Sequence, residues 1–132
     1  MPLQVELVSP ERVVLEAEAD MVLARTIGGG DVAFMPGHAP FLGALQTFTV
    51  TIWLSDGTKE VAAVHGGFIS VSDDHVRILS NLAELGSQVD VARAQRARDE
   101  AMAGAQAEVD VEHEAALRRA QARLSAAGVV TA

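Results

Sequence analysis

The pattern of apolar residues changes near residues 87–90, and this change constrains the fold of the 132-residue chain more than any other feature. Before it, short apolar and β-branched runs alternate with turn sequences, which is typical of an all-β domain. After it, Ala97, Ala101 and Ala105 recur every four residues, which is the spacing of one helix face. We therefore predict two domains, a β domain at residues 1–86 and an α-helical one at residues 87–132.

The first domain has the pattern of an antiparallel β-sandwich, because many short strands follow one another without intervening helices. Asp56-Gly57 lies between two β-prone runs and predicts a hairpin turn. The adjacent glycines 28–30 predict a turn and lack the spacing of a dinucleotide-binding loop. The expected strands are Leu3–Val8, Arg12–Ala17, Met21–Thr26, Phe48–Leu54, Lys59–His65, Phe68–Val71 and Val76–Ser80.

The second domain predicts an antiparallel hairpin of two helices of about fifteen residues each, because the connection between them is short. Asp90 is placed to cap the first helix, residues 104–109 form the expected break, and Asp110 is placed to cap the second helix, which runs to about Ala126. The apolar positions are mostly alanines, which contribute little on burial. We therefore expect a hairpin that is marginally stable alone and that either docks on the sandwich or binds another partner.

Composition excludes several classes of function. The formal charge of −8 argues against a nucleic-acid partner, since phosphate binding relies on clustered cations. The chain has no cysteine, and its four histidines lack metal-ligand spacing, so no metal site is expected and each histidine is read as a turn or surface residue. No stretch is apolar enough to span a membrane, residues 1–8 do not resemble a signal peptide, and no catalytic constellation stands out.

The arginines of the helical domain are the best candidates for a ligand site. An antiparallel hairpin brings the end of its second helix near the start of its first, so Arg93, Arg119 and Arg123 are expected to converge. Convergent guanidinium groups suit a polyphosphate, because each offers a bidentate fork. Surface ion pairs with glutamate and aspartate explain the same spacing equally well, and the sequence leaves both readings open.

Two stretches resemble a known family, the epsilon subunit of bacterial F-type ATP synthase. The first is Asp31–Leu42, which contains the run GHAP at residues 37–40, and the second is Val64–Val71, followed by Val76–Leu79. The resemblance extends over essentially the whole chain and departs from the family pattern at residues 45–50. It implies a non-catalytic subunit with the predicted sandwich and hairpin.

The resemblance further implies what the sandwich binds. Its partners would be the gamma subunit of the central stalk and the ring of c subunits, with proton flow coupled to ATP synthesis at the cytoplasmic face of the bacterial plasma membrane and no insertion into it. The Asp31–Pro40 loop would face the ring, with Asp31 as a polar contact and His38 and Pro40 shaping the loop. An alternative is that His38 and Pro40 serve the turn alone.

For the hairpin, the resemblance implies an arm that lies on the sandwich or extends along gamma, reaches the alpha and beta subunits, and inhibits ATP hydrolysis. No cofactor is required, but some family members bind ATP as a regulatory ligand through a motif similar to Ile/Leu-Asp-x-x-Arg-Ala. Asp90, Arg93 and Ala94 match this motif, and Val89 is a conservative departure from it. Glu84, Arg119 and Arg123 also match positions that contact the nucleotide in such members.

Two alternatives stay open for this site. A further family arginine is missing; it would fall near Glu100, and Arg96 or Arg98 on a neighbouring turn is the alternative to it. Asp90 and Arg93 are also explained as a helix cap and a first-turn ion pair. The alternative function for the whole chain is a free ATP-sensing adaptor that uses the arginine cluster of the hairpin.

Overall fold

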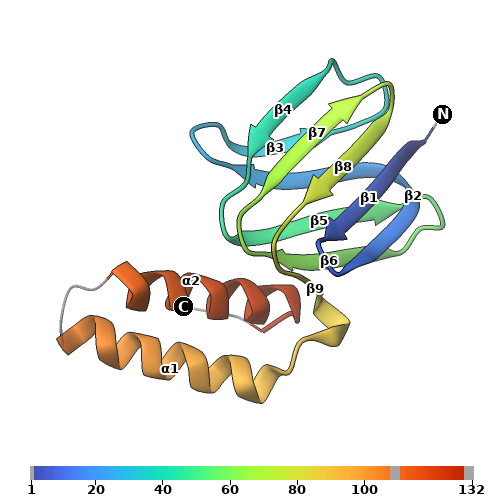
Figure 1. Ribbon diagram of the computed structural model, residues 1–132. Helices are drawn as coiled ribbons and strands as arrows, with labels where there is room; N and C mark the ends of the chain where they lie inside the picture. Colours follow the sequence, from blue (N-terminus) through green and yellow to red (C-terminus); the bar gives the residue numbers. More distant parts are fainter. Residues whose placement is uncertain (1, 108–110, 130–132) are drawn as a thin grey trace.

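Strands occupy the first two thirds of the chain and helices the last third (Figure 1). The computed structural model describes residues 2–107 and 111–129, without the side chains of residues 104–107, 111 and 113. The elements of this part are β1 Leu3–Ser9, β2 Arg12–Thr26, β3 Gly30–Phe34, β4 Phe41–Ala44, β5 Phe48–Leu54, β6 Lys59–Val64, β7 Phe68–Ser72, β8 His75–Leu79, β9 Ala83–Leu85, the 3₁₀ turn η1 Gly86–Gln88, α1 Val91–Ala107 and α2 Val111–Ala126.

The long strand β2 joins the two layers of the sandwich. Its first part pairs with β1, and its second part pairs with β3 and β5. The register with β5 shifts between Ala19 and Met21, an irregularity of the kind that bends a strand and increases its twist. The two segments expected at residues 12–17 and 21–26 are therefore one strand, and the prediction of a break between them was wrong.

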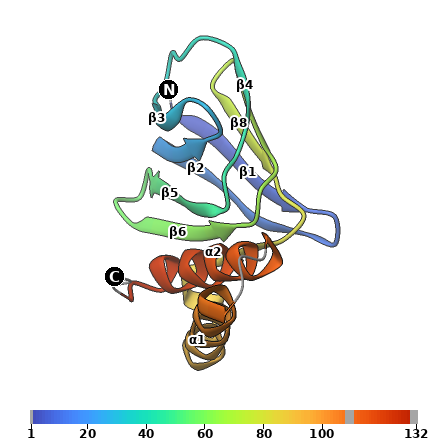
Figure 2. The same ribbon diagram turned by 90° about the vertical axis from the view of Figure 1, so that its left-hand side faces the viewer.

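The strands follow the order β4-β7-β8-β1-β2-β5-β6-β9, with β3 beside β2. Figure 2 shows the layers facing each other, with β8 and β1 on one side and β5 and β6 on the other. Among the described strands, β1 and β8 pair in parallel and the other pairs are antiparallel. Alternate residues point inward, and the largest fully buried side chains of the sandwich include Phe34, Leu3, Leu7, Leu45, Ile52, Ile69 and Ile78.

The turn predictions hold at both sites. Gly28 and Gly30 have φ of +83° and +67°, and β3 begins directly at Gly30. In the β5–β6 hairpin, the Thr58 N–H donates to Asp56 Oδ1 at 2.9 Å and Gly57 has φ of +91°. Such positive values favour glycine because they bring a Cβ atom into steric conflict.

The two helices form the predicted hairpin, and α2 lies between α1 and the sandwich (Figure 2). It contacts β5, β6 and η1, and Ala122 and Ala126 pack on Ala63 of β6. The first helix continues through Ala107, so the break predicted from residue 104 onward begins too early, while the cap predicted at Asp110 lies outside the described residues. Neither helix, over its described residues, has the length and apolar character that crossing a membrane requires.

Candidate functional site

A pocket of about 520 Å³ opens where the hairpin meets the sandwich. It brings together β9, the segment that leads into the hairpin, the start of α1 and the end of α2. Among the ligand residues predicted from the sequence, five line it, whereas Val89 and Arg119 do not. The lining residues are Leu82, Glu84, Gln88, Asp90, Arg93, Ala94, Ala97 and Arg123.

Asp90 caps the first turn of α1, as predicted. Its Oδ1 accepts a hydrogen bond from the Arg93 N–H at 3.0 Å, and its carbonyl accepts one from the Ala94 N–H at 3.0 Å. A capping carboxylate satisfies a donor that the helix leaves unpaired and interacts favourably with the positive end of the helix dipole. Capping is by itself a sufficient structural reason for an aspartate at position 90. The same hydrogen bond holds the backbone of Arg93 beside the pocket.

Arg123 and Glu84 form an ion pair that joins α2 to β9. Arg123 Nε donates to Glu84 Oε1 at 2.6 Å, and both side chains are about three quarters buried, with 25% and 24% exposed. The short distance and partial burial make this a charge-assisted hydrogen bond of the stronger kind. Of the two arginines that line the pocket, Arg123 is thus already neutralised by a carboxylate.

Arg119 does not line the pocket with the other two arginines. Its Nη2 donates to Glu112 Oε1 at 2.8 Å, two turns back along the same helix. The surface ion pair that the sequence left open is therefore the observed state of this residue. Leu82 and Gln88 line the pocket although the sequence did not predict them. Their positions depend on the path of the chain before and after β9, which the spacing of residues within the helices does not determine.

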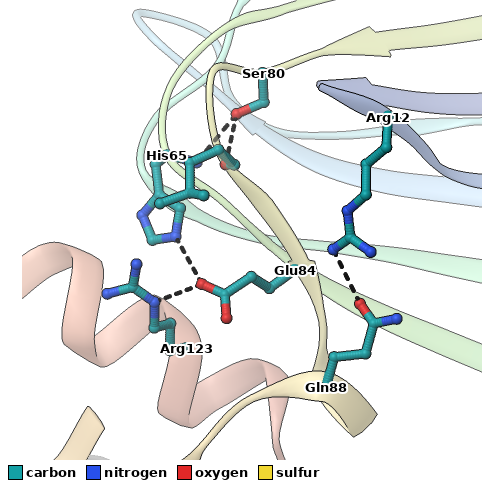
Figure 3. A network of polar contacts seen from close by, with 7 residues as sticks. Arg12, His65, Ser80, Glu84, Gln88 and Arg123 are labelled. Carbon is teal, nitrogen blue, oxygen red and sulfur yellow. Dashed lines mark hydrogen bonds and ion pairs between the residues drawn. The ribbon is translucent and has the colours of Figure 1, made fainter. Parts of the chain in front are cut away.

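His65 lies beside the Glu84–Arg123 pair, at the end of β6 (Figure 3). The expectation of a turn or surface histidine was wrong, because only 6% of this side chain is exposed. Burial is the main cause that lowers the pKa of His65 to about 4; the Arg123 charge adds to the effect, Glu84 opposes it, and Arg119 contributes further lowering. The sequence carries one signal, because the expected strand Lys59–His65 ends at this residue, directly after the apolar residues 61–64.

Residues 31–34 of the segment expected to form a loop facing the rotor ring belong to strand β3, and only residues 35–40 form a loop, on the side of the sandwich away from the helices (Figure 1). Asp31 Oδ1 accepts from Arg25 Nε at 2.9 Å, and the Arg25 guanidinium stacks 3.8 Å from the Phe48 ring centre. The His38 ring packs edge-on against buried Phe34 at 4.9 Å, while Pro40 is exposed.

Contacts within the loop explain how it holds its shape. The Gly37 N–H donates to Asp74 Oδ1 at 2.7 Å, so the loop is tied to the β7–β8 turn. His38 Nδ1 lies 2.7 Å from the Ala39 carbonyl oxygen. These contacts agree with a loop-shaping role for His38, and they leave the proposed contact of Asp31 with a partner untested.

A β-sandwich followed by a docked helical hairpin, with a charged pocket at the joint, defines the structural class of the chain. Comparison with known proteins gives the particular family. The family model described as ATP synthase, Delta/Epsilon chain, beta-sandwich domain matches residues 2–86. The ATP synthase epsilon chain of Streptomyces griseus is 48% identical over 127 residues, with 96% of each chain covered.

A second relative, the ATP synthase epsilon chain of Moorella thermoacetica, is 42% identical and covers 97% of this chain and 98% of its own. The chain therefore belongs to the ATP synthase epsilon-chain family, whose members are non-catalytic subunits of the complex. A chain of the Euglena gracilis mitochondrial ATP synthase structure shares the fold, with a TM-score of 0.81, 23% identity, and 96% of this chain and 81% of that chain covered.

Proposed function

We propose that the chain is a central-stalk subunit that couples proton flow to ATP synthesis and inhibits ATP hydrolysis when its helical hairpin leaves the sandwich. The observation that carries the proposal is the small hairpin interface, in which alanines of α2 meet an alanine of β6 beside one ion pair. Packings that differ by only a few kcal/mol can be exchanged by a partner that binds one of them better.

The sandwich supplies surfaces for permanent partners. The face opposite the core exposes large apolar side chains, with Leu42 of β4 74% exposed and Phe68 of β7 57% exposed. A groove of about 360 Å³ lies beside Phe68 and Leu79. Exposed apolar groups gathered in this way indicate a protein interface, and we assign it to the gamma subunit.

The far end of the sandwich is assigned to the ring of c subunits. His38 and Pro40 belong to a loop that is tied down by Asp74 on the side away from the hairpin, and Asp31 precedes this loop on β3 (Figure 1). A loop held in shape in this way is suited to a specific contact because little conformational entropy is lost on binding. The chain would then lie peripherally at the cytoplasmic face of the bacterial plasma membrane, and the extended hairpin would reach the alpha and beta subunits.

ATP is proposed as a regulatory ligand of the pocket at the joint. Arg93 and Arg123 line it, and Arg123 must exchange Glu84 for a phosphate. Arg119 would have to leave Glu112 to take part. We expect Arg93→Ala to weaken ATP binding by roughly 1.5–3 kcal/mol, as for hydrogen bonds to charged groups, in a calorimetric titration. Absence of heat and of competition at millimolar ATP would exclude this ligand.

The inhibitory role is tested with the catalytic core of ATP synthase purified without this subunit. We expect the full chain to slow ATP hydrolysis, and a chain truncated before Asp90 to bind without slowing it. Equal inhibition by both chains would assign the effect to the sandwich. If neither chain binds the core, the assignment to the central stalk fails, and a free ATP-sensing adaptor becomes the better proposal.

A locked variant provides the matched control without truncation. Ala63 and Ala122 belong to one buried cluster across the hairpin interface, so we choose these two positions for a pair of cysteines to tether α2 to β6. The native sequence has no cysteine to compete. We expect the oxidised variant to bind without inhibiting and the reduced variant to inhibit like the native chain.

A further inference from the structure

The joint between sandwich and hairpin contains a buried titratable group that the function proposed above does not use. His65 directly follows β6, and its backbone N–H donates to the Leu82 carbonyl at 3.1 Å and the Ser80 hydroxyl at 3.3 Å. The Ser80 hydroxyl in turn donates to the Leu82 carbonyl at 2.9 Å. The backbone of His65 is therefore fixed to the β8–β9 connection, and its ring points toward α2 (Figure 3).

The hydrogen-bonding groups of the His65 imidazole ring, unlike those of its backbone, are unpaired in the described structure. Neither ring nitrogen has a hydrogen-bond partner in the part of the chain that the structure describes. His65 Nε2 lies 3.9 Å from Glu84 Oε1, which is too long for a hydrogen bond. That same oxygen accepts the 2.6 Å hydrogen bond from Arg123, so the neighbouring carboxylate is already engaged by α2. A buried polar group left without partners is costly and calls for an explanation.

The charged groups that act on the ring come from both sides of the joint. Glu84 of β9 favours a protonated ring, while Arg123 and Arg119 of α2 disfavour it. Burial adds the largest effect in the same direction as the arginines, and together they lower the pKa of His65 to about 4. With α2 in place, the ring is therefore neutral at neutral pH.

We propose that His65 is a proton-sensitive latch, in which a neutral ring lets α2 lie on the sandwich and a protonated ring drives α2 away. Departure of α2 removes Arg119 and Arg123 from the ring and opens it to water. Glu84, released from Arg123, is then available to pair with the imidazolium. This latch concerns docking alone, so it stands whether or not the released hairpin inhibits hydrolysis.

The sign of the pH effect follows from linkage. The released state has the ordinary histidine pKa near 6.5, and the docked state has a lower one of about 4. The ratio of docked to released hairpin is therefore constant above about pH 6.5 and falls by up to about tenfold per pH unit between the two values, because the released state binds more protons. Below about pH 4 the ratio no longer changes through this residue.

The test measures hairpin release in the full chain against pH. Lys59→Cys on the sandwich and Ala103→Cys on α1 are exposed positions for a pair of distance labels, and no native cysteine interferes. We expect the native chain to release its hairpin progressively below pH 6.5. His65→Gln should remove this dependence, whereas His75→Gln, a control at an exposed histidine of β8, should keep it. Identical release curves for the native chain and His65→Gln would overturn the latch.

A second measurement keeps the proposal testable if His65→Gln does not fold. The His65 ring can be titrated by NMR in the full chain, with Arg123→Gln compared against Arg118→Gln, an exposed position on the same helix. We expect Arg123→Gln to raise the pKa of His65 by at least one unit, because Glu84 then becomes free to pair with the ring, and Arg118→Gln to leave it unchanged. A native His65 that titrates near 6.5 with the hairpin still docked would contradict the latch.

Discussion

The core of the sandwich and the interface between the hairpin and the sandwich are built from different kinds of side chain. Inside the sandwich, fully buried phenylalanine, leucine, isoleucine and valine side chains from both layers form one cluster. At the hairpin interface, the cluster consists of Ala63, Ala122 and Ala126 with Val61 beside them. Burying a large apolar side chain contributes about 1.5–3 kcal/mol, far more than an alanine. The two regions thus use side chains of different size, which is why we propose that the hairpin contact is the reversible one.

This difference also separates the proposed functions. A sandwich that stays folded can hold permanent partners, whereas a hairpin held by alanines and one ion pair can move. Leu124 of α2 is fully buried, so the hairpin is not devoid of large apolar contacts, but the cluster that it forms with the sheet contains only small residues of α2. Substitutions in each region should therefore affect different measurements.

The largest effect is expected in the sandwich core. Phe34→Ala removes a fully buried aromatic ring and should lower the free energy of unfolding by about 3–5 kcal/mol, because it leaves a cavity. Urea unfolding followed by the fluorescence of Trp53 measures this loss. Leu42→Ala, at a side chain that is 74% exposed, is the matched control and should change stability little. Equal losses from both substitutions would mean that the core does not lie between the layers.

The second largest effect is expected on the docking of the hairpin to the sandwich. A Cβ atom on Gly86 would collide with the backbone carbonyl of Ala126 at the end of α2 and crowd the Val61 carbonyl. Gly86→Ala should therefore weaken docking by about 1–3 kcal/mol, as for other overpacked sites. Limited proteolysis of the helices measures docking, and Ser87→Ala, at an exposed neighbour, is the control. Loss of the sandwich fold instead would show that the two regions are not separable.

A smaller effect is expected within the hairpin. Asp90→Ala removes the cap of α1 and should cost about 1 kcal/mol of helix stability, within the usual range for such caps. Helicity followed by circular dichroism on heating detects the loss. Asp99→Ala, at an exposed residue in the middle of the same helix, should change stability by less than about 0.5 kcal/mol. A larger loss from Asp99→Ala would contradict the capping role.

The smallest effect on stability is expected at Asp31 of β3. Asp31→Asn breaks an ion pair with Arg25 between partly exposed side chains and should cost less than about 1 kcal/mol of stability. Binding of the isolated ring of c subunits should nevertheless weaken if Asp31 contacts it. Thermal unfolding and a binding assay on the same variant separate the two outcomes. Unchanged binding would remove Asp31 from the proposed contact and leave it a structural residue.

Sequence patterns predicted the two kinds of structure, most of the strands and the Asp90 cap, because period and capping are local properties. Three strands were missed: β4 and β9 have only four and three residues, and β3 begins at Gly30, within the glycines read as a turn. The first helix runs through Gly104 because one glycine costs a helix only about 1 kcal/mol, less than its alanine neighbours can offset.

The candidate site was predictable only in part. Helical spacing placed Arg93 and Arg123 together at the joint, as the pocket lining shows. Arg119 does not line that pocket and pairs with Glu112 on its own helix. The burial of His65 was missed because it depends on α2 lying against β6, a contact between residues distant in the sequence that no local pattern encodes.

Native-state hydrogen exchange compares the two regions most directly in the unmodified chain. Local openings exchange amides at a lower free energy than global unfolding does. If the hairpin is a detachable arm, the amides of Ala120 and Leu124 should exchange at a clearly lower free energy than those of Ile52 and Ile78, although all four side chains are fully buried. Exchange of all four only by global unfolding would show that hairpin and sandwich form one cooperative unit, and the detachable arm would be excluded.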